Sequence, residues 1–240
     1  MNKMLNPWDK NVSYRINELE FRIDKTYWEL LVPLFIKEIN NITPNKRIID
    51  VGCGLGFLTH EIASRVDKIT GIDTSFRSIE YAKSRFDEKC GIEFKNISII
   101  DFQRKYHDIR YDICIANMVF HNISNLDQNL NAISKLLINN GYLIFSVPHP
   151  AFWYASRKFK EKDKAFNYSI EKEYFVPFKI KNRKKHPYLI KYFHRSEQQY
   201  YELLKKNNFK SEDLKEPFLH SNSQSKTCIS DIYFCVYRLA

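Results

Sequence analysis

The sequence lacks the features that would assign the protein to a membrane or to the extracellular space. No apolar run approaches the roughly 20 residues that a membrane-spanning helix needs. The N-terminal segment MNKMLNPWDKN has no apolar core of the kind that a signal peptide carries. The five cysteines form no CxxC pair, so we expect free, reduced thiols and no metal site. These absences predict a cytoplasmic protein without membrane association.

The composition excludes general disorder and places most of the charge in one segment. A chain of 240 residues that is 44% hydrophobic and 28% charged can bury a sizeable core, as one domain or one domain with an insertion. The net charge is +10, and residues 151–195 account for +9 of it, with thirteen Lys/Arg against four Asp/Glu. The same residues are rich in aromatic side chains. Such a segment can face nucleic acid, an anionic small molecule or only solvent.

Apolar runs and turn residues alternate along the chain, which predicts strands and helices in turn. The expected strands are 46–51, 68–73, 92–99, 111–119, 141–148, 209–218 and 228–239. The expected helices are 15–40, bent or divided at Pro33, then 57–66, 78–86, 129–137 (closed by Asn140-Gly141) and 196–209. Near-continuous apolar strands are typical of a parallel sheet covered on both faces. We therefore predict an α/β fold with a doubly wound, Rossmann-like, seven-stranded sheet whose last strand is antiparallel.

Glycine is scarce, yet three of the six glycines lie at every second position in RIIDVGCGLGF, residues 47–57. A glycine allows the backbone to approach a ligand that a Cβ would exclude, and in open α/β sheets ligands lie beyond the carboxyl ends of the strands. The spacing is G-x-G-x-G and not the G-x-G-x-x-G of dinucleotide sites. Asp50 precedes the first glycine by two residues, which favours a cationic or hydroxyl-rich ligand. Asp73 ends the next strand, where a ribose diol would be bound.

Four segments together resemble a known family: IIDVGCGLG, GIDTS, YDICIANMVFHNI and NNGYLIFSVPHP. They are similar to class I S-adenosylmethionine-dependent methyltransferases of the small-molecule type, over roughly residues 45–150. The resemblance implies S-adenosylmethionine as cofactor and S-adenosylhomocysteine as product. It also implies four parts, namely an N-terminal helical cap (1–44), a cofactor-binding core (45–150), a substrate lid inserted between strand five and the last helix (151–195), and a C-terminal part (196–240) that completes the core.

The resemblance also implies a role for individual residues. It assigns the methionine end of the cofactor to Asp50, Gly52, Cys53, Gly54 and Gly56, the ribose to Asp73 and Thr74, the adenine to Ser98 and Ile99, and the neighbourhood of the methyl group to Asn117 and Met118. Tyr14 would contact the cofactor from an N-terminal segment that folds over it. Many members carry Asp where Ser98 stands, so Ser98 would accept a weaker hydrogen bond from the adenine amino group.

An amine or hydroxyl acceptor must lose a proton during methylation, and a nearby base can take it. His149, just past the fifth strand, is the leading candidate for that base, and His121, just after the fourth strand, is the second. A structural His149 held between Pro148 and Pro150 is the open alternative. His194 is interpreted as a hinge or capping residue before the last helix.

The acceptor would be enclosed by the lid and the N-terminal segment. The residues expected around it are Trp8, Phe152, Trp153, Tyr154, Tyr174 and Tyr192. Lysines of the lid would select a small-molecule acceptor that carries a carboxylate or phosphate. The methyl group would be transferred to an O or N atom of that acceptor. The protein itself is expected to be a monomer or a homodimer.

An RNA methyltransferase is the competing hypothesis, with the basic segment along phosphates and aromatic side chains stacked on bases. Enzymes that methylate amino groups of bases often carry N/D-P-P-Y/F after the fourth strand. This chain has Asn117-Met118-Val119-Phe120 there, which argues against that type. A small-molecule acceptor is therefore favoured over nucleic acid, and a protein acceptor stays open.

Overall fold

The computed structural model describes residues 6–42, 46–86, 91–152, 161, 163–180, 185–217 and 230–240. Trp153 and Tyr154, both expected at the acceptor, lie outside the described residues. Within the described ranges, none of the helices combines the length and the apolar character needed to cross a bilayer.

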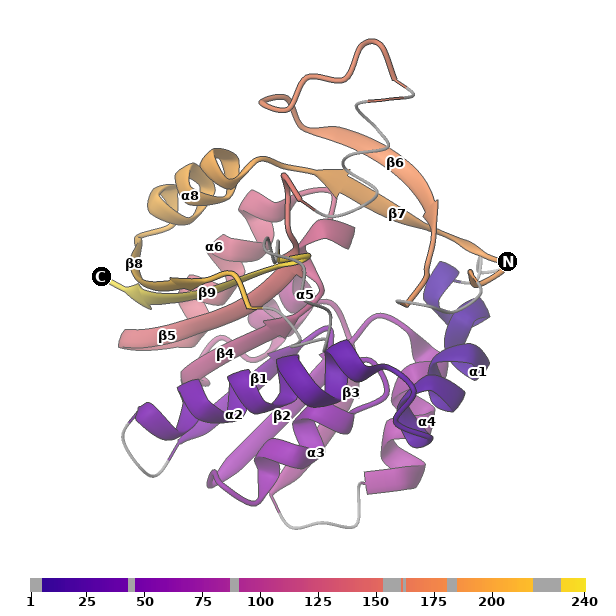
Figure 1. The fold of residues 1–240 in the computed structure, drawn as a ribbon. Coiled ribbons are helices and arrows are strands. Elements are labelled where there is room, and N and C mark those ends of the chain that lie inside the picture. The colour runs from indigo at the N-terminus through magenta and orange to yellow at the C-terminus, as the bar shows by residue number, and fades with distance from the viewer. Residues whose placement is uncertain are drawn as a thin grey trace.

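A seven-stranded sheet with the order β3-β2-β1-β4-β5-β9-β8 forms the centre of the molecule (Figure 1). Its strands are β1 Arg47–Val51, β2 Lys68–Asp73, β3 Ile92–Asn96, β4 Tyr111–Asn117, β5 Leu137–Pro148, β8 Phe209–Lys215 and β9 Ile232–Leu239. The strands from β3 to β5 are parallel, and β9 runs antiparallel to both β5 and β8. The predicted doubly wound sheet with an antiparallel last strand is confirmed.

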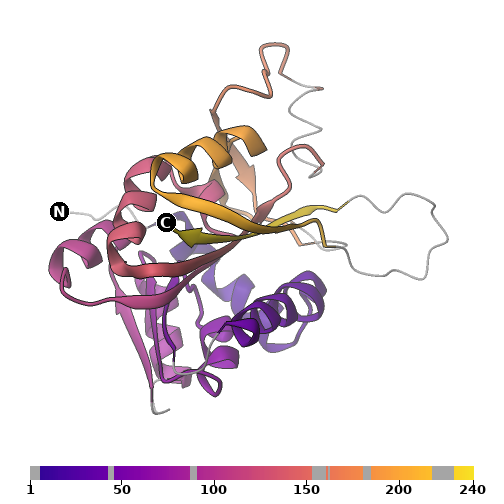
Figure 2. The same cartoon turned by 90° about the vertical axis from the view of Figure 1, so that its left-hand side faces the viewer.

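Helices cover both faces of this sheet, as the apolar strands require (Figure 2). One face packs against α2 Val32–Asn41, α3 Phe57–Ala63 and α4 Phe76–Phe86, and the other against α5 Ile99–Lys105, α6 Leu126–Leu136 and α8 Glu197–Lys206. Successive side chains of a strand point to opposite faces. Ile113 and Ile115 of β4 therefore join the first core, whereas Cys114 and Ala116 join the second.

The N-terminal region is divided differently from the prediction of one helix over 15–40. Helix α1 spans Pro7–Glu20 and is capped by Asn6, whose side chain accepts from Trp8 N at 3.0 Å. A π-helical segment, η1 Thr26–Leu31, then leads into α2, and Pro33 lies in the first turn of that helix. A proline is tolerated there because the first N–H groups of a helix have no partner within it. The chain is therefore divided at residues 21–24, and the predicted division at Pro33 is wrong, because the helical run continues through that residue.

The predicted helix end at Asn140-Gly141 is wrong. Helix α6 begins at Leu126 behind the cap Asn125, and the chain enters β5 directly at Leu137. Asn140 has a φ of 61°, and a Cβ on Gly141 would meet Ile138 O at 2.9 Å. The register of β4 and β5 also shifts between Tyr111 and Ile113. The Asn-Gly pair therefore belongs to an irregularity inside a long strand.

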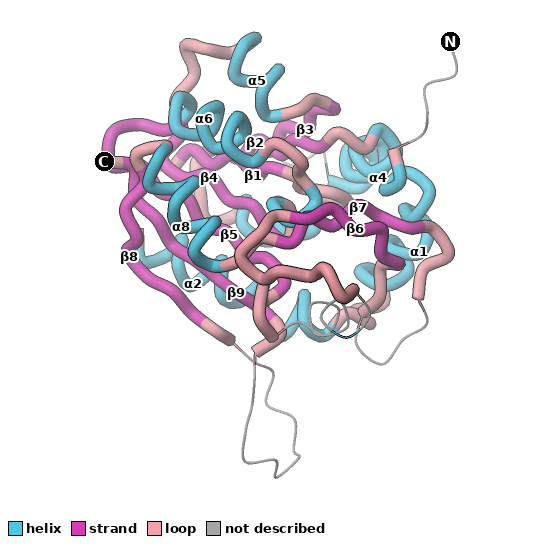
Figure 3. The backbone as a smooth tube through the Cα atoms, turned by 90° about the horizontal axis from the view of Figure 1, so that it is seen from above, coloured by secondary structure: helices cyan, strands magenta, loops and turns pink. Residues whose placement is uncertain are grey.

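The insertion after β5 forms a second, two-stranded antiparallel sheet from β6 Lys172–Pro177 and β7 Leu189–His194. Seen from above, this β6–β7 hairpin lies beside α1 (Figure 3). A small core joins them, in which Val176, Ile190 and Tyr192 pack against Trp8. The hairpin and α1 therefore lie together over the carboxyl ends of the parallel strands.

Candidate active site

A cavity of about 1090 Å³ lies at the carboxyl edge of the sheet, under α1 and the β6–β7 hairpin. Ten of the residues predicted to contact the cofactor line it: Asp50, Gly52, Cys53, Gly54, Asp73, Thr74, Ser98, Ile99, Asn117 and Met118. This volume exceeds that of most single-ligand pockets, so it is large enough for a nucleoside-sized cofactor and a small second molecule.

Asp50 sits on β1 between β2 and β4 and is 1% exposed. Its Oδ2 accepts a hydrogen bond from Thr59 Oγ1 at 2.6 Å. Burial raises the pKa of Asp50 to about 7. Burial disfavours the ionised form of this carboxyl, and one hydroxyl partner offsets that only in part. A bound cation would stabilise the ionised form, so Asp50 suits a ligand with a positively charged amine. Thr59 is a site residue that the sequence reasoning missed.

The three glycines of the turn all have left-handed backbones, with φ of 70°, 53° and 79°. A Cβ on Gly52 would lie 2.5 Å from Val119, and one on Gly56 would lie 2.7 Å from Phe94. A Cβ on Gly54 would meet nothing within 4 Å. Gly52 and Gly56 are therefore required by packing, and Gly54 is the glycine whose bare Cα faces open cavity. Gly56 is the N-cap of α3 and is not among the residues that line the cavity.

Asp73 ties the end of β2 to the glycine turn. Its Oδ2 accepts from Gly54 N at 2.9 Å and its Oδ1 from Ser75 N at 2.7 Å. Burial raises the pKa of the Asp73 carboxyl. The carboxylate thereby lies in the cavity beside Gly54, where it can accept from hydroxyl groups of a ligand.

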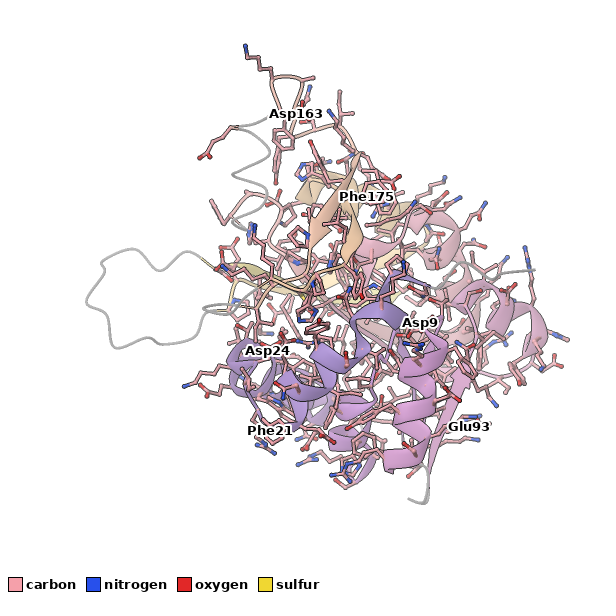
Figure 4. The ribbon with its side chains drawn as sticks, turned by 90° about the vertical axis from the view of Figure 1, so that its right-hand side faces the viewer. Asp9, Phe21, Asp24, Glu93, Asp163 and Phe175 are labelled. Carbon is pink, nitrogen blue, oxygen red and sulfur yellow. The ribbon has the colours of Figure 1, made fainter. Side chains whose placement is uncertain are left out.

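Helix α1 is fastened to this part of the site by hydrogen bonds. Asp9, which Figure 4 shows on α1 beside α4, accepts from Ser75 Oγ at 2.6 Å and from Arg77 N at 3.1 Å. Asn6 Nδ2 donates to Thr74 Oγ1 at 3.2 Å. The N-terminal segment therefore covers the loop after β2 through Asn6 and Asp9, and its predicted contact with the cofactor stays a prediction.

Ser98 lies at the cavity as a helix cap and not at the end of a strand. Strand β3 ends at Asn96, and the Ser98 hydroxyl donates to Asp101 Oδ2 at 2.6 Å and accepts from Asp101 N at 3.1 Å. These bonds occupy the hydroxyl in the structure. The apolar side chains of Ile97 and Ile99 flank it and offer a surface for a flat ring.

The end of β4 is held in an uncommon backbone conformation. Met118 has a φ of 58°, and its N–H donates to Ser146 O at 3.0 Å. Ser146 Oγ in turn donates to Asn117 Oδ1 at 2.8 Å. A left-handed residue that is not glycine costs energy and is common at functional sites. Asn117 and Met118 are both brought to the cavity by this turn.

Tyr14 does not line the cavity, which corrects its predicted role. The residue is 45% exposed, and its ring lies 5.1 Å from the ring of His186. The neighbouring Arg15 lines the cavity instead and donates to Glu18 at 2.6 Å and Asp24 at 2.9 Å. Glu18 Oε1 also lies 2.8 Å from His186 Nε2, so this charged group joins α1 to the hairpin segment.

His149, the leading candidate for a base, also lies outside the cavity lining. It is buried, its Nε2 lies 3.2 Å from Glu216 Oε1, and its Nδ1 accepts from Ala151 N at 3.2 Å. The backbone N–H of His149 donates to Asp231 O. These contacts close the turn after β5 and are those expected of the structural alternative, so the catalytic role of His149 stays a prediction.

His121, the second candidate, does line the cavity from the short helix η2 Phe120–Asn122. It is 6% exposed, and its ring centroid lies 5.6 Å from that of Tyr192. Burial, with the nearby charge of Arg195, lowers the pKa of His121 to about 3. The imidazole is therefore neutral at physiological pH and resists protonation in this environment.

Three of the six predicted acceptor residues line the cavity, namely Trp8, Tyr174 and Tyr192. Tyr174 donates to Asp163 Oδ2 at 3.0 Å, at the upper end of the hairpin region in Figure 4. Phe152 is 37% exposed, its ring lies tilted at 4.5 Å from that of His149, and it is not part of the lining. His194 ends β7 and lies 3.0 Å from Tyr168 O, which places it before the last helix as expected.

Lysines at the cavity come from the hairpin segment. Lys179, Lys185 and Lys191 all line it. Lys191 Nζ is paired with Glu173 at 2.8 Å, whereas Lys179 and Lys185 are exposed and make no ion pair with another described residue. Two uncompensated positive charges therefore lie on the hairpin side of the cavity.

Comparison with known proteins identifies the family. The family described as "Methyltransferase domain" matches residues 42–208, more than half of the chain. The chain belongs to the methyltransferase-domain family. The resemblance to S-adenosylmethionine-dependent methyltransferases, with that compound as cofactor, is confirmed at the level of the family.

Individual relatives match shorter stretches. The malonyl-[acyl-carrier protein] O-methyltransferase of Acetivibrio thermocellus is 36% identical over 101 residues, 41% of this chain and 34% of that protein. A ubiquinone biosynthesis O-methyltransferase of Actinobacillus pleuropneumoniae is 26% identical over 145 residues, 58% of each. The chain thus spans less than two thirds of either relative.

A solved structure shares the fold over nearly the whole chain. The N-methyltransferase NodS of Bradyrhizobium japonicum in complex with S-adenosylhomocysteine has a TM-score of 0.59 at 13% identity, covering 97% of this chain and 96% of that one. At this identity the likeness shows the fold alone. The cavity at the carboxyl edge, with Asp50, Gly54 and Asp73 around it, fits such a cofactor independently.

Proposed function

We propose that this protein transfers a methyl group from S-adenosylmethionine to an O or N atom of a small acceptor that carries an anionic group. The observation that carries the proposal is the single cavity that holds Asp50, Gly54 and Asp73 at one side and His121 with the hairpin aromatics at another. A cofactor and an acceptor bound there would share one enclosed space.

The residues of this chain divide the work of binding. Asp50 pairs with the amine of the methionine end. The positive charge of that amine lowers the pKa of Asp50, so the carboxyl ionises when the cofactor binds. Asp73 accepts from the ribose hydroxyls, and Gly54 allows close approach of the backbone. Ile97 and Ile99 pack against the adenine. The cofactor supplies an activated methyl group, whose carbon–sulfur bond breaks as the bond to the acceptor forms, leaving S-adenosylhomocysteine.

The chemistry left to the protein is alignment and exclusion of water. His121 lies at the cavity, but its lowered pKa makes the neutral imidazole a weak base, so in this proposal it orients the O–H or N–H group of the acceptor. The acceptor loses its proton to solvent as the carbon–sulfur bond breaks and the bond to the acceptor forms. The positive charge of the sulfonium leaves with that proton.

The class of acceptor is inferred from charge. Lys179 and Lys185 lack a counter-charge among the described residues, and Trp8 and Tyr192 supply flat apolar surface. A planar or acyl molecule with a carboxylate or phosphate suits both. The names of the relatives, two O-methyltransferases and one N-methyltransferase, support O or N as the methylated atom.

A panel assay with tritiated S-adenosylmethionine tests the proposal. The panel contains hydroxy acids, amino acids, phosphorylated small molecules, a phenolic carboxylic acid and total tRNA. We expect transfer to an anionic small molecule, and the Lys179→Glu/Lys185→Glu double variant should raise its KM at least tenfold. Transfer to tRNA alone, with binding that weakens steeply with salt, would replace the proposal by the RNA hypothesis.

A further inference from the structure

Helix α1 buries more polar side chains than apolar ones. Four of its residues are buried, of which Leu19 is apolar and Asp9, Asn11 and Glu18 are polar. Each residue of an α-helix turns by about 100°, so Asn11 and Glu18 lie on one side of α1 and Asp9 lies on the opposite side. Buried polar side chains are normally paired. Polar side chains buried on two opposite sides therefore indicate a helix that joins two other parts of the molecule.

On the first side, α1 is bound to the loop after β2. Asp9 Oδ1 accepts from Ser75 Oγ at 2.6 Å, and the backbone N–H of Ser75 donates to Asp73 Oδ1 at 2.7 Å. Ser75 thus stands between the carboxylate of α1 and the carboxylate that lines the cavity. Burial, with the nearby charge of Asp9, raises the pKa of Asp73. A ligand that binds Asp73 therefore acts on α1 through a single intervening residue.

On the second side, α1 is bound to the residues just before β7. Asn11 Nδ2 donates to Tyr188 O at 3.3 Å, and Glu18 Oε1 lies 2.8 Å from His186 Nε2. Burial raises the pKa of Glu18, but the hydrogen bond with His186 and the charge of Arg15 outweigh it and hold the pKa below its ordinary value. The carboxylate is therefore ionised, and hydrogen bonds to an ionised group are the stronger kind.

The β6–β7 hairpin is attached at both of its ends. At its base, Arg195 donates to Glu171 from Nε at 2.9 Å and from Nη2 at 2.7 Å, and to Phe120 O in the turn after β4 at 3.0 Å. Its other end, where Pro177 pairs with Leu189, lies against α1. A two-stranded sheet has little stability of its own. The order of this second end therefore depends on the position of α1.

We propose that α1 couples the two sides of the cavity: a cofactor bound beneath it fixes α1, and α1 fixes the acceptor hairpin through Asn11 and His186. Both are positioning residues, because both are buried and neither lines the cavity. The proposal rests on the proposed function and adds a route by which an occupied cofactor site shapes the acceptor site. Coupling between two sites is reciprocal, so an acceptor at the hairpin strengthens cofactor binding by the same factor.

Hydrogen exchange measured by mass spectrometry tests the coupling without knowledge of the acceptor. In the wild type, saturating S-adenosylhomocysteine should slow exchange in α1, β6 and β7 at least tenfold. In Asn11→Ala/His186→Ala it should still slow exchange in α1, but the slowing in β6 and β7 should fall below threefold. The double variant loses the contacts with Tyr188 and Glu18 and keeps every residue that lines the cavity. Equal slowing of β6 and β7 in both proteins would show direct contact with the cofactor and overturn the coupling.

Two further variants locate the link. Glu173→Gln removes the 2.8 Å ion pair with Lys191 inside the same hairpin, which does not reach α1, and it should behave as the wild type. Asp9→Ala cuts the opposite side of α1 from Ser75 and keeps the contacts with the hairpin, yet it should also lose most of the slowing in β6 and β7. Wild-type slowing in Asp9→Ala would exclude α1 as the link. The single variants Asn11→Ala and His186→Ala should each show intermediate slowing, and they decide the matter if the double variant does not fold.

Calorimetry with S-adenosylhomocysteine on the same proteins keeps the two proposals apart. Wild-type protein that fails to bind it would reject the proposed function and the coupling with it. Wild-type protein that binds it without slower exchange in β6 and β7 would leave the proposed function in place and overturn the coupling alone. The acceptor found in the panel should raise the affinity for S-adenosylhomocysteine at least threefold in the wild type and not in Asn11→Ala/His186→Ala. An equal rise in both would contradict the role of these two residues.

Discussion

The two sides of the cavity are built in different ways. The cofactor side comes from β1, β2 and the turns directly behind them, where Asp50, Gly54 and Asp73 lie within one strand–helix–strand unit. The acceptor side joins α1, the turn at 120–124 and the β6–β7 hairpin, which are far apart in the chain. The first is held by backbone geometry and the second by buried ion pairs. The side proposed for the methyl donor is therefore local in the chain, whereas the side proposed for the acceptor is assembled from distant segments.

The largest effect is expected within the cofactor side, at its glycines. Gly52→Ala combines a left-handed φ with a Cβ 2.5 Å from Val119, so it should lower the free energy of unfolding by about 3 kcal/mol. Gly54→Ala meets no neighbour and should cost only about 1 kcal/mol. Denaturant unfolding measures both.

The order of the two variants should reverse when cofactor binding is measured. Gly54→Ala, which loses less stability, should lose more affinity for its stability loss than Gly52→Ala. A Cβ at Gly54 would project into the open cavity, so folded Gly54→Ala should bind S-adenosylhomocysteine at least tenfold more weakly in calorimetry. Undiminished affinity would show that Gly54 serves only the backbone and would weaken the division between packing glycines and the ligand glycine.

The next effect tests the ribose assignment. Asp73→Ala removes a charged hydrogen-bond acceptor and should weaken cofactor binding by about 1–3 kcal/mol. Asp112→Ala is the matched control, since Asp112 Oδ2 also accepts from a backbone N–H, that of Arg47 at 2.7 Å, at the opposite end of β1. Calorimetry should find the control unchanged. Equal affinity in both variants would take Asp73 out of the ribose site.

A pH dependence is expected from Asp50. Its pKa of about 7 leaves it largely protonated in the free protein below neutrality, and a bound cationic amine favours the ionised form. Binding must then release a proton, so affinity should fall by up to about tenfold per pH unit below pH 7. Asp50→Asn should bind weakly with a flat profile. A flat profile in the wild type would contradict the contact with the amine.

The smallest effect distinguishes the two histidines. His149→Ala should leave methyl transfer within about twofold of wild type and cost about 1–2 kcal/mol of stability, because the residue lies against Glu216 and Glu197 and closes a turn. His121→Gln should lower transfer at least tenfold at similar stability. Both are measured with the panel acceptor and by thermal unfolding. A turnover defect in His149→Ala would restore it as a candidate.

Much of the cofactor side could be predicted from the sequence because its signals are local. Strand periodicity located β1 and β2, and the carboxyl ends of parallel strands share one edge, so Asp50 and Asp73 had to meet there. Spacing cannot distinguish a glycine that faces a ligand from one that is pressed on Phe94, as Gly56 is. That distinction depends on which distant side chain packs against the turn.

The sequence by itself determined the class of fold, the family and the edge of the sheet that holds the cofactor, because these follow from hydrophobic periodicity and short motifs. Only the tertiary structure decided which histidine lines the cavity. His149 and His121 both follow strands of the same sheet, but the first turns toward Glu216, whereas Arg195 carries the second into the cavity. A side chain 75 residues away makes that choice, and no local pattern encodes a contact over such a separation.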